Sequence, residues 1–251
     1  LVALCSALLG ASLVLKRYSM IGDGLSHVGF GALSIAMAMN VAPLAVAIPV
    51  VVAAAFLLLR LSQNGKLRGD SAIALISSGA LAAGVLVTSL SSGLNADVYG
   101  YMFGSILSMG EGDVILSLIL ALVVLVMFIL FYNNIFAITF DESFARATGT
   151  RANLYSMIIA LLTALTIVIG MRIMGTMLIS GLIIFPALTA MRLCSSFRGV
   201  VLLSALVSVL CFLIGMVLSY AIATPAGASI VMTNVVAYCI FWAIGKLKAH
   251  F

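Results

Sequence analysis

Long apolar runs separated by short polar connections make up most of the chain. Nine of these runs approach the roughly 20 residues that an α-helix needs to cross a hydrocarbon layer about 30 Å thick. Because the runs lack the two-residue alternation of barrel strands, they predict helices. The sequence therefore predicts an all-α integral membrane protein, a bundle of eight or nine transmembrane helices forming one domain over residues 1–251. The runs cover residues 1–15, 22–41, 43–61, 71–92, 113–132, 154–171, 173–193, 200–221 and 227–247.

Two places in the chain leave the helix count open. Arg172 lies at a tight junction between the runs 154–171 and 173–193, where a broken helix fits as well as two full spans. The first run starts at Leu1 without a methionine, so we expect further residues to precede it. Lys16 and Arg17 follow this run, whereas a cleavable signal peptide carries its positive charge before the apolar stretch.

Composition identifies the solvent of this chain as a lipid bilayer. Hydrophobic residues make up 65% and charged residues 8%, against about 25% charged in soluble domains. The net charge of +5 does not indicate nucleic-acid binding, because the basic residues are dispersed singly or in pairs. The four cysteines lie in apolar runs without a C-x-x-C pair, so neither a disulfide framework nor a zinc knuckle is indicated.

Basic residues near the helix ends predict the orientation in the membrane. They fall in alternate connections, which we expect to face the cytoplasm. Asp97, Glu111 and Asp113 lie at the opposite, outer ends of spans, where we expect them to be solvated, and His250 lies near the chain end. The basic groups are Lys16 with Arg17, Arg60 with Lys66 and Arg68, Arg146 with Arg151, Arg192 with Arg198, and Lys246 with Lys248.

Two connections are long enough to have their own function. Residues 93–112 form an aromatic and glycine-rich connection on the predicted outer side. Residues 133–153 form the most polar stretch, on the predicted inner side. Within it, residues 141–148 favour a short amphipathic helix: acidic residues suit its start, Phe144 and Ala147 share a face, and Gly149 ends it.

Nucleotide-binding and common hydrolase motifs are absent from the sequence. It contains no G-x-x-x-x-G-K-[ST] loop, no H-E-x-x-H pair and no G-x-S-x-G turn. We therefore do not expect an enzyme, and any ATP hydrolysis must reside on another chain.

Asp23 and His27 form the most informative local pattern. Residues four apart lie on one helix face, and a carboxylate at the centre of a membrane helix costs about 3 kcal/mol. Carboxylate oxygen and imidazole nitrogen suit zinc, manganese or iron as a transported ion, and waters or a second copy of the chain could complete the ligand shell. The alternative is that Asp23 caps the helix start and His27 only donates a hydrogen bond.

Four blocks of the sequence resemble the bacterial ABC-3 class of ABC importer permeases. The resemblance covers essentially the whole chain and rests on the blocks in their family order. They are KRYSMIGDGLSHVGFGALSIA at 16–36, FDESFARATGTR at 140–151, RIMGTMLISGLIIFPALTA at 172–190 and TPAGASIV at 224–231.

The resemblance implies the membrane subunit of an ATP-driven importer of zinc or manganese, with iron a further candidate, in the bacterial inner membrane. It implies a homodimeric or pseudo-symmetric permease with a fold like that of the cobalamin importers. It also implies two cytoplasmic ATPase subunits and an extracytoplasmic metal-binding protein, with no permanently bound cofactor. The metal-recognition pattern falls on Asp23 and His27. The cytoplasmic coupling segment falls on residues 134–153, around Asp141, Glu142, Ala145 and Gly149.

Three other functions stay open from the residues alone. A permease for a metal chelate or cobalamin would not need Asp23 and His27. An intramembrane enzyme could use the same pair as acid and base. A passive channel would conduct without ATP.

Overall fold

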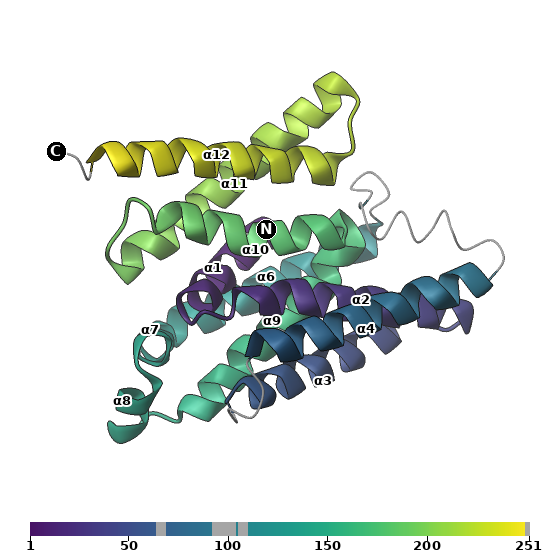
Figure 1. The fold of residues 1–251 in the computed structure, drawn as a ribbon, viewed down its shortest axis with the longest axis horizontal. Helices are drawn as coiled ribbons and strands as arrows, with labels where there is room; N and C mark the ends of the chain where they lie inside the picture. The colour runs from purple at the N-terminus through teal and green to yellow at the C-terminus, as the bar shows by residue number, and fades with distance from the viewer. Residues whose placement is uncertain (64–68, 92–103, 105–109, 249–251) are drawn as a thin grey trace.

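The computed structural model describes residues 1–63, 69–91, 104 and 110–248, and these residues are helical apart from short turns (Figure 1). The helices on the N-terminal side are α1 (Val2–Leu15), α2 (Ser19–Ala38), α3 (Pro43–Gln63), α4 (Gly69–Leu90) and α6 (Glu111–Leu130). Those that follow are α7 (Tyr132–Phe140), α8 (Glu142–Ala147), α9 (Ala152–Met174), α10 (Thr176–Ala190), α11 (Phe197–Ile222) and α12 (Ala226–Lys248).

The helices confirm the prediction of an all-α membrane protein. Within the described ranges, six helices are long and apolar enough to cross a membrane, namely α3, α4, α6, α9, α11 and α12. The apolar helices α1 and α10 are shorter, and α2 has the length but carries Asp23 and His27. Together with the six, these three are the longer helices among the described residues, and the count of eight or nine transmembrane helices stays a prediction.

The interior of the bundle is formed by α1, α9 and α10, with α2 packed beside them (Figure 1). Twelve of the residues of α1 are buried, and α1 packs against α9, α10 and α11. The outer helices instead leave large apolar side chains uncovered, such as Leu122 on α6 and Leu202 on α11. In water such a surface would drive aggregation, whereas acyl chains solvate it.

Glycines allow two of the central helix pairs to approach closely. A Cβ at Gly31 on α2 would lie 2.5 Å from the carbonyl oxygen of Ala80 on α4. A Cβ at Gly10 on α1 would collide with the carbonyl of Ile183 on α10. Small residues at such contacts let backbones pack directly, which is the usual basis of helix association in lipid.

Connections that we expect on the cytoplasmic side lie at one end of the bundle. The short helices α7 and α8 lie at the same end of the bundle as the C-terminal end of α12, at left in Figure 1. At the junction of α9 with α10, Arg172 pairs with Asp113 at the start of α6, with Nη1 and Oδ1 3.2 Å apart. We expected Asp113 to be solvated, but it forms an ion pair with Arg172. Lys66, Arg68, Asp97 and His250 lie outside the described residues.

Three boundaries differ from the sequence-based expectation. Helix α2 begins at Ser19, so Asp23 lies inside the helix and does not cap it. Residues 132–140 form α7, whereas we expected a short helix only over residues 141–148 of this connection. Helix α9 continues past Arg172 to Met174, so the break expected at Arg172 lies at Gly175, and α10 begins at Thr176. Gly175 has a φ of 86°, a conformation that glycine adopts without strain.

Candidate functional site

Asp23 and His27 lie on one face of α2, as their spacing predicts. The Nε2 atom of His27 is 3.6 Å from Oδ2 of Asp23, and the two side chains keep 30% and 39% of their surface exposed. Since α2 begins at Ser19 and each helical residue adds about 1.5 Å, Asp23 lies about 6 Å and His27 about 12 Å from the helix start, so His27 is close to the middle of this 20-residue helix. The pair therefore extends from the second turn of α2 to the middle of the helix.

A serine on α10 joins this polar cluster. The hydroxyl oxygens of Ser26 on α2 and Ser180 on α10 are 2.9 Å apart, and both residues are buried. The Ser26 hydroxyl lies 2.7 Å from the Asp23 carbonyl oxygen, to which it can donate. Ser34, further along α2, donates to the carbonyl of Phe30 in its own helix.

The Asp23–His27 pair offers an incomplete ligand set for a cation. The Nδ1 atom of His27 is buried without a hydrogen-bond partner in the described structure. No third His, Cys, Asp or Glu joins the pair within the residues that the structure describes. One carboxylate and one imidazole can hold a divalent ion only loosely, which suits a site that must release its cargo.

The predicted short helix after residue 140 is present as α8. The Asp141 carboxylate caps it, accepting a hydrogen bond of 2.9 Å from the Phe144 backbone N–H. Ala145 is fully buried, whereas Phe144 is 64% exposed. Gly149 follows the helix with a φ of 86°, as the C-terminal glycine of a helix commonly does. The helix thus presents its apolar Phe144 outward, away from its own domain.

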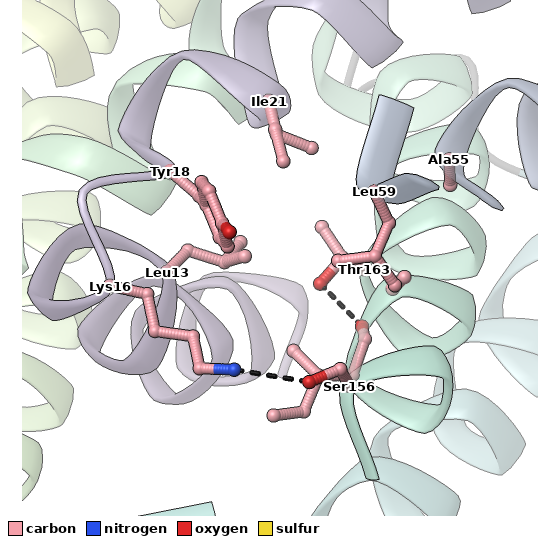
Figure 2. A pocket seen from close by; sticks show the side chains of 10 residues that line it. Leu13, Lys16, Tyr18, Ile21, Ala55, Leu59, Ser156 and Thr163 are labelled. Atoms are coloured by element: carbon pink, nitrogen blue, oxygen red, sulfur yellow. Dashed lines mark hydrogen bonds between the residues drawn. The ribbon is translucent and has the colours of Figure 1, made fainter. Parts of the chain in front are cut away.

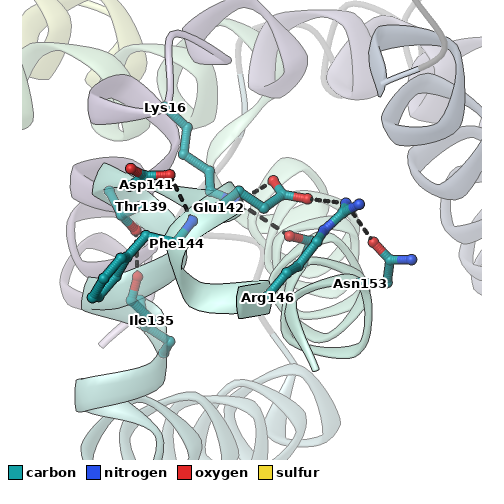
Figure 3. A network of polar contacts seen from close by, with 9 residues as sticks. Lys16, Ile135, Thr139, Asp141, Glu142, Phe144, Arg146 and Asn153 are labelled. Atoms are coloured by element: carbon teal, nitrogen blue, oxygen red, sulfur yellow. Dashed lines mark hydrogen bonds and ion pairs between the residues drawn. The ribbon is translucent and has the colours of Figure 1, made fainter. Parts of the chain in front are cut away.

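A polar network connects α8 with α1 and α9 (Figure 3). Lys16, at the end of α1, lies 3.5 Å from Oε2 of Glu142, while Oε1 of Glu142 accepts a hydrogen bond of 2.5 Å from Arg146. Arg146 also donates to Asn153, which is in α9. Lys16 was expected only as a basic flank of the membrane, but its side chain is 8% exposed.

Ser180 and Lys16 take part in these contacts, although the sequence did not assign either of them to a functional site. Nothing in the sequence near Ser180 separates it from other serines of apolar helices. Lys16 does have a signal, since it stands in the first block of the family resemblance, but its charge favours a flanking interpretation. Only the packing of α1 against its neighbours distinguishes the two roles.

Comparison with known proteins places the chain in a family. The model of the ABC 3 transport family matches residues 1–245. The manganese import system permease protein ScaB of Streptococcus gordonii is 26% identical over 96% of this chain and 86% of its own length. The high-affinity zinc uptake system membrane protein ZnuB of Haemophilus influenzae is 28% identical over 92% of this chain and 89% of its own length.

Solved structures show the same fold. A chain of PsaBC from Streptococcus pneumoniae, in complex with a Fab, superposes with a TM-score of 0.85 and 26% identity, covering 98% of this chain and 91% of that one. An inward-facing putative metal-chelate type ABC transporter gives a TM-score of 0.64 at 14% identity, which supports the fold alone. The motifs of the sequence, the helical bundle and the family match agree, and this chain belongs to the ABC 3 transport family.

Proposed function

We propose that this chain is the membrane-spanning permease subunit of an ATP-driven importer of divalent metal ions, in the bacterial inner membrane. The observation that carries the proposal is the Asp23–His27 pair, one carboxylate and one imidazole at 3.6 Å in a helix of an ABC 3 chain. Such groups are rarely placed in a membrane helix without a polar role. Relatives named for manganese and for zinc import support the cargo class.

The ligand set favours a site shared between two copies of the chain. Asp23 and His27 are each about one-third exposed, so a second copy could approach them. Two carboxylates and two imidazoles would give the four ligands that zinc prefers, and manganese would accept the same groups with added water. The cargo is then held between subunits, where a small relative movement changes its affinity.

Energy must come from another chain, because no phosphate-binding loop is present in the sequence. Helix α8 is a suitable contact for a cytoplasmic ATPase subunit. It lies at the end of the bundle with basic connections, and it exposes Phe144 beside the charged pair Glu142 and Arg146. An extracytoplasmic metal-binding protein would deliver the ion from the other side.

The test is metal uptake by cells that express the permease with its ATPase and capture protein. Asp23→Ala and His27→Ala should each abolish accumulation of manganese or zinc, while the ATPase still copurifies with the permease. Ser34→Ala is the matched control, because its hydroxyl on the same helix bonds only to the backbone of Phe30 among the described contacts. Full uptake by His27→Ala would refute the assignment of the site.

The same variants distinguish a different cargo. A permease for a metal chelate would keep its uptake in Asp23→Ala, since the chelator and not the protein would coordinate the ion. Flux of the free ion that continues without ATP would instead indicate a channel.

A further inference from the structure

Lys16 occupies the turn that joins α1 to α2 (Figure 2). Helix α1 ends at Leu15 and α2 begins at Ser19. The turn between them is tight: Arg17 has a φ of 63°, and the Tyr18 backbone N–H donates to the carbonyl of Leu13 at 2.8 Å. A displacement of Lys16 therefore moves the start of α2, and Asp23 follows seven residues later in the chain.

The Lys16 amine is held by partners on two other helices. Its Nζ donates to the hydroxyl of Ser156 on α9 at 3.1 Å and pairs with Glu142 on α8 at 3.5 Å. The surrounding pocket is largely apolar, with Leu13, Ile21 and Leu59 among its walls. Burial lowers the pKa of Lys16, and the nearby Glu142 carboxylate opposes that shift. The buried ammonium thus depends on Glu142 for its charge partner.

The two carboxylate oxygens of Glu142 contact two different cationic side chains. Oε1 pairs with Arg146 within α8, and Oε2 pairs with Lys16. The Arg146 side chain is 52% exposed, so solvent weakens its pair, whereas the Lys16 side chain is almost covered. In the part of the chain that the structure describes, the Lys16–Glu142 contact is the ion pair that joins α8 to α1.

We propose that Lys16 is the positioning residue through which movement of α8 reaches the Asp23–His27 pair. When the ATPase displaces α8, Glu142 pulls on Lys16, and the short α1–α2 turn carries that displacement to the helix that holds the ligands. The hydrogen bond to Ser156 fixes the Lys16 amine on α9, so that α1 and α9 move together. This inference rests on the proposed function, because it assumes that α8 docks the ATPase and that Asp23 and His27 bind the cargo.

A purely flanking role predicts a different surrounding. A basic residue that only marks the cytoplasmic side points into water, as its exposed neighbour Arg17 does. Lys16 instead lies in an apolar pocket, where an amine is costly unless its partners are fixed. Of the two adjacent basic residues, exposed Arg17 has only the orienting role of a membrane flank, whereas buried Lys16 is placed to couple the helices. Arg17 is therefore the matched control.

The experiment measures Mn²⁺ transported per ATP hydrolysed by the permease–ATPase complex in proteoliposomes that contain the capture protein. The variants are Lys16→Met, which keeps side-chain length without charge, Glu142→Gln, their combination, and Arg17→Gln as control. We expect each single variant to lower the ratio on the order of tenfold. The combination should lower it no further, because both changes remove the same interaction. The ATPase should still copurify with Lys16→Met, and Arg17→Gln should keep the wild-type ratio.

A wild-type ratio in Lys16→Met, or losses that multiply in the combination, would overturn the proposal. If Lys16→Met does not accumulate in the membrane, Glu142→Gln decides alone, since it leaves Lys16 bonded to Ser156. Asp23→Ala, measured in parallel, separates this inference from the metal site. Unchanged transport by Asp23→Ala together with uncoupling by Lys16→Met would remove the proposed site and leave the coupling role in place.

Discussion

Ser26 on α2 and Ser180 on α10 place their hydroxyl oxygens 2.9 Å apart, across 154 positions of the sequence. One of them can donate to the other, and Ser26 also lies within hydrogen-bonding distance of the Asp23 carbonyl. The contact fixes the rotation of α2 relative to α10, and with it the direction in which the ligand pair points.

Ser180→Ala should therefore impair transport without unfolding the protein. Loss of one buried hydrogen bond costs about 1 kcal/mol, which corresponds to roughly a fivefold lower affinity if it falls on the bound state. The measurement is the KM and maximal rate of Mn²⁺ uptake, with a raised KM expected. Thr189→Ala is the control on the same helix, since its buried hydroxyl donates to Phe185. Equal defects in both variants would argue against a role at the ligand pair.

Gly31→Ala should destabilise the contact between α2 and α4. The added methyl group would lie 2.5 Å from the Ala80 carbonyl oxygen, and overpacking of this kind typically costs about 1–3 kcal/mol. The midpoint of thermal unfolding in detergent should fall. Gly79→Ala on α4 is the matched control, because no atom lies within 4 Å of its added Cβ. That change should leave the midpoint unchanged or raise it, since alanine favours a helix over glycine.

Asp141→Ala should weaken the docking of the ATPase through loss of the cap of α8. The missing hydrogen bond to the Phe144 N–H costs about 1 kcal/mol of helix stability. Asp141→Asn keeps a capping oxygen and should dock normally. Copurification of the ATPase with the permease measures the difference, and an equal loss with Asn would point to the charge rather than to the cap.

Gly149→Ala tests the backbone at the end of the same segment. Nothing lies within 4 Å of an added Cβ there, so its only cost is the positive φ, about 1–2 kcal/mol. Asparagine tolerates this conformation better, and Gly149→Asn should lose less ATPase in the same copurification assay. If alanine and asparagine behave alike, the conformation of Gly149 does not limit docking.

Most of the fold follows from the apolar runs because lipid imposes a minimum helix length and forbids unpaired backbone. The boundaries of α2 were less predictable, since its N-cap residue is Tyr18, which makes no side-chain capping hydrogen bond, whereas Asp23 is a residue type that often caps a helix. Helix α7 was missed because its nine residues are too few to span a membrane, and a mixed run such as IFAITF suits several conformations.

The site was partly predictable for a similar reason. A spacing of four puts Asp23 and His27 on one face of any helix, so local geometry was sufficient for that pair. Ser180 and Lys16 acquire their partners from α2, α8 and α9, which lie far away in sequence. Helical spacing gives no information about such contacts. The local sequence around a lysine at a helix end is the same whether its side chain is buried or exposed to solvent.

The burial of α1 also constrains how the molecule is made. Its neighbours α9, α10 and α11 follow more than 130 residues later, so α1 enters the bilayer long before the surfaces that enclose it exist. Its small side chains, among them Ala7 and Gly10, offer little contact area for packing against the helices that are synthesised first. Assembly should thus be late and cooperative, and a nascent chain stopped before α10 should expose α1 to membrane proteases.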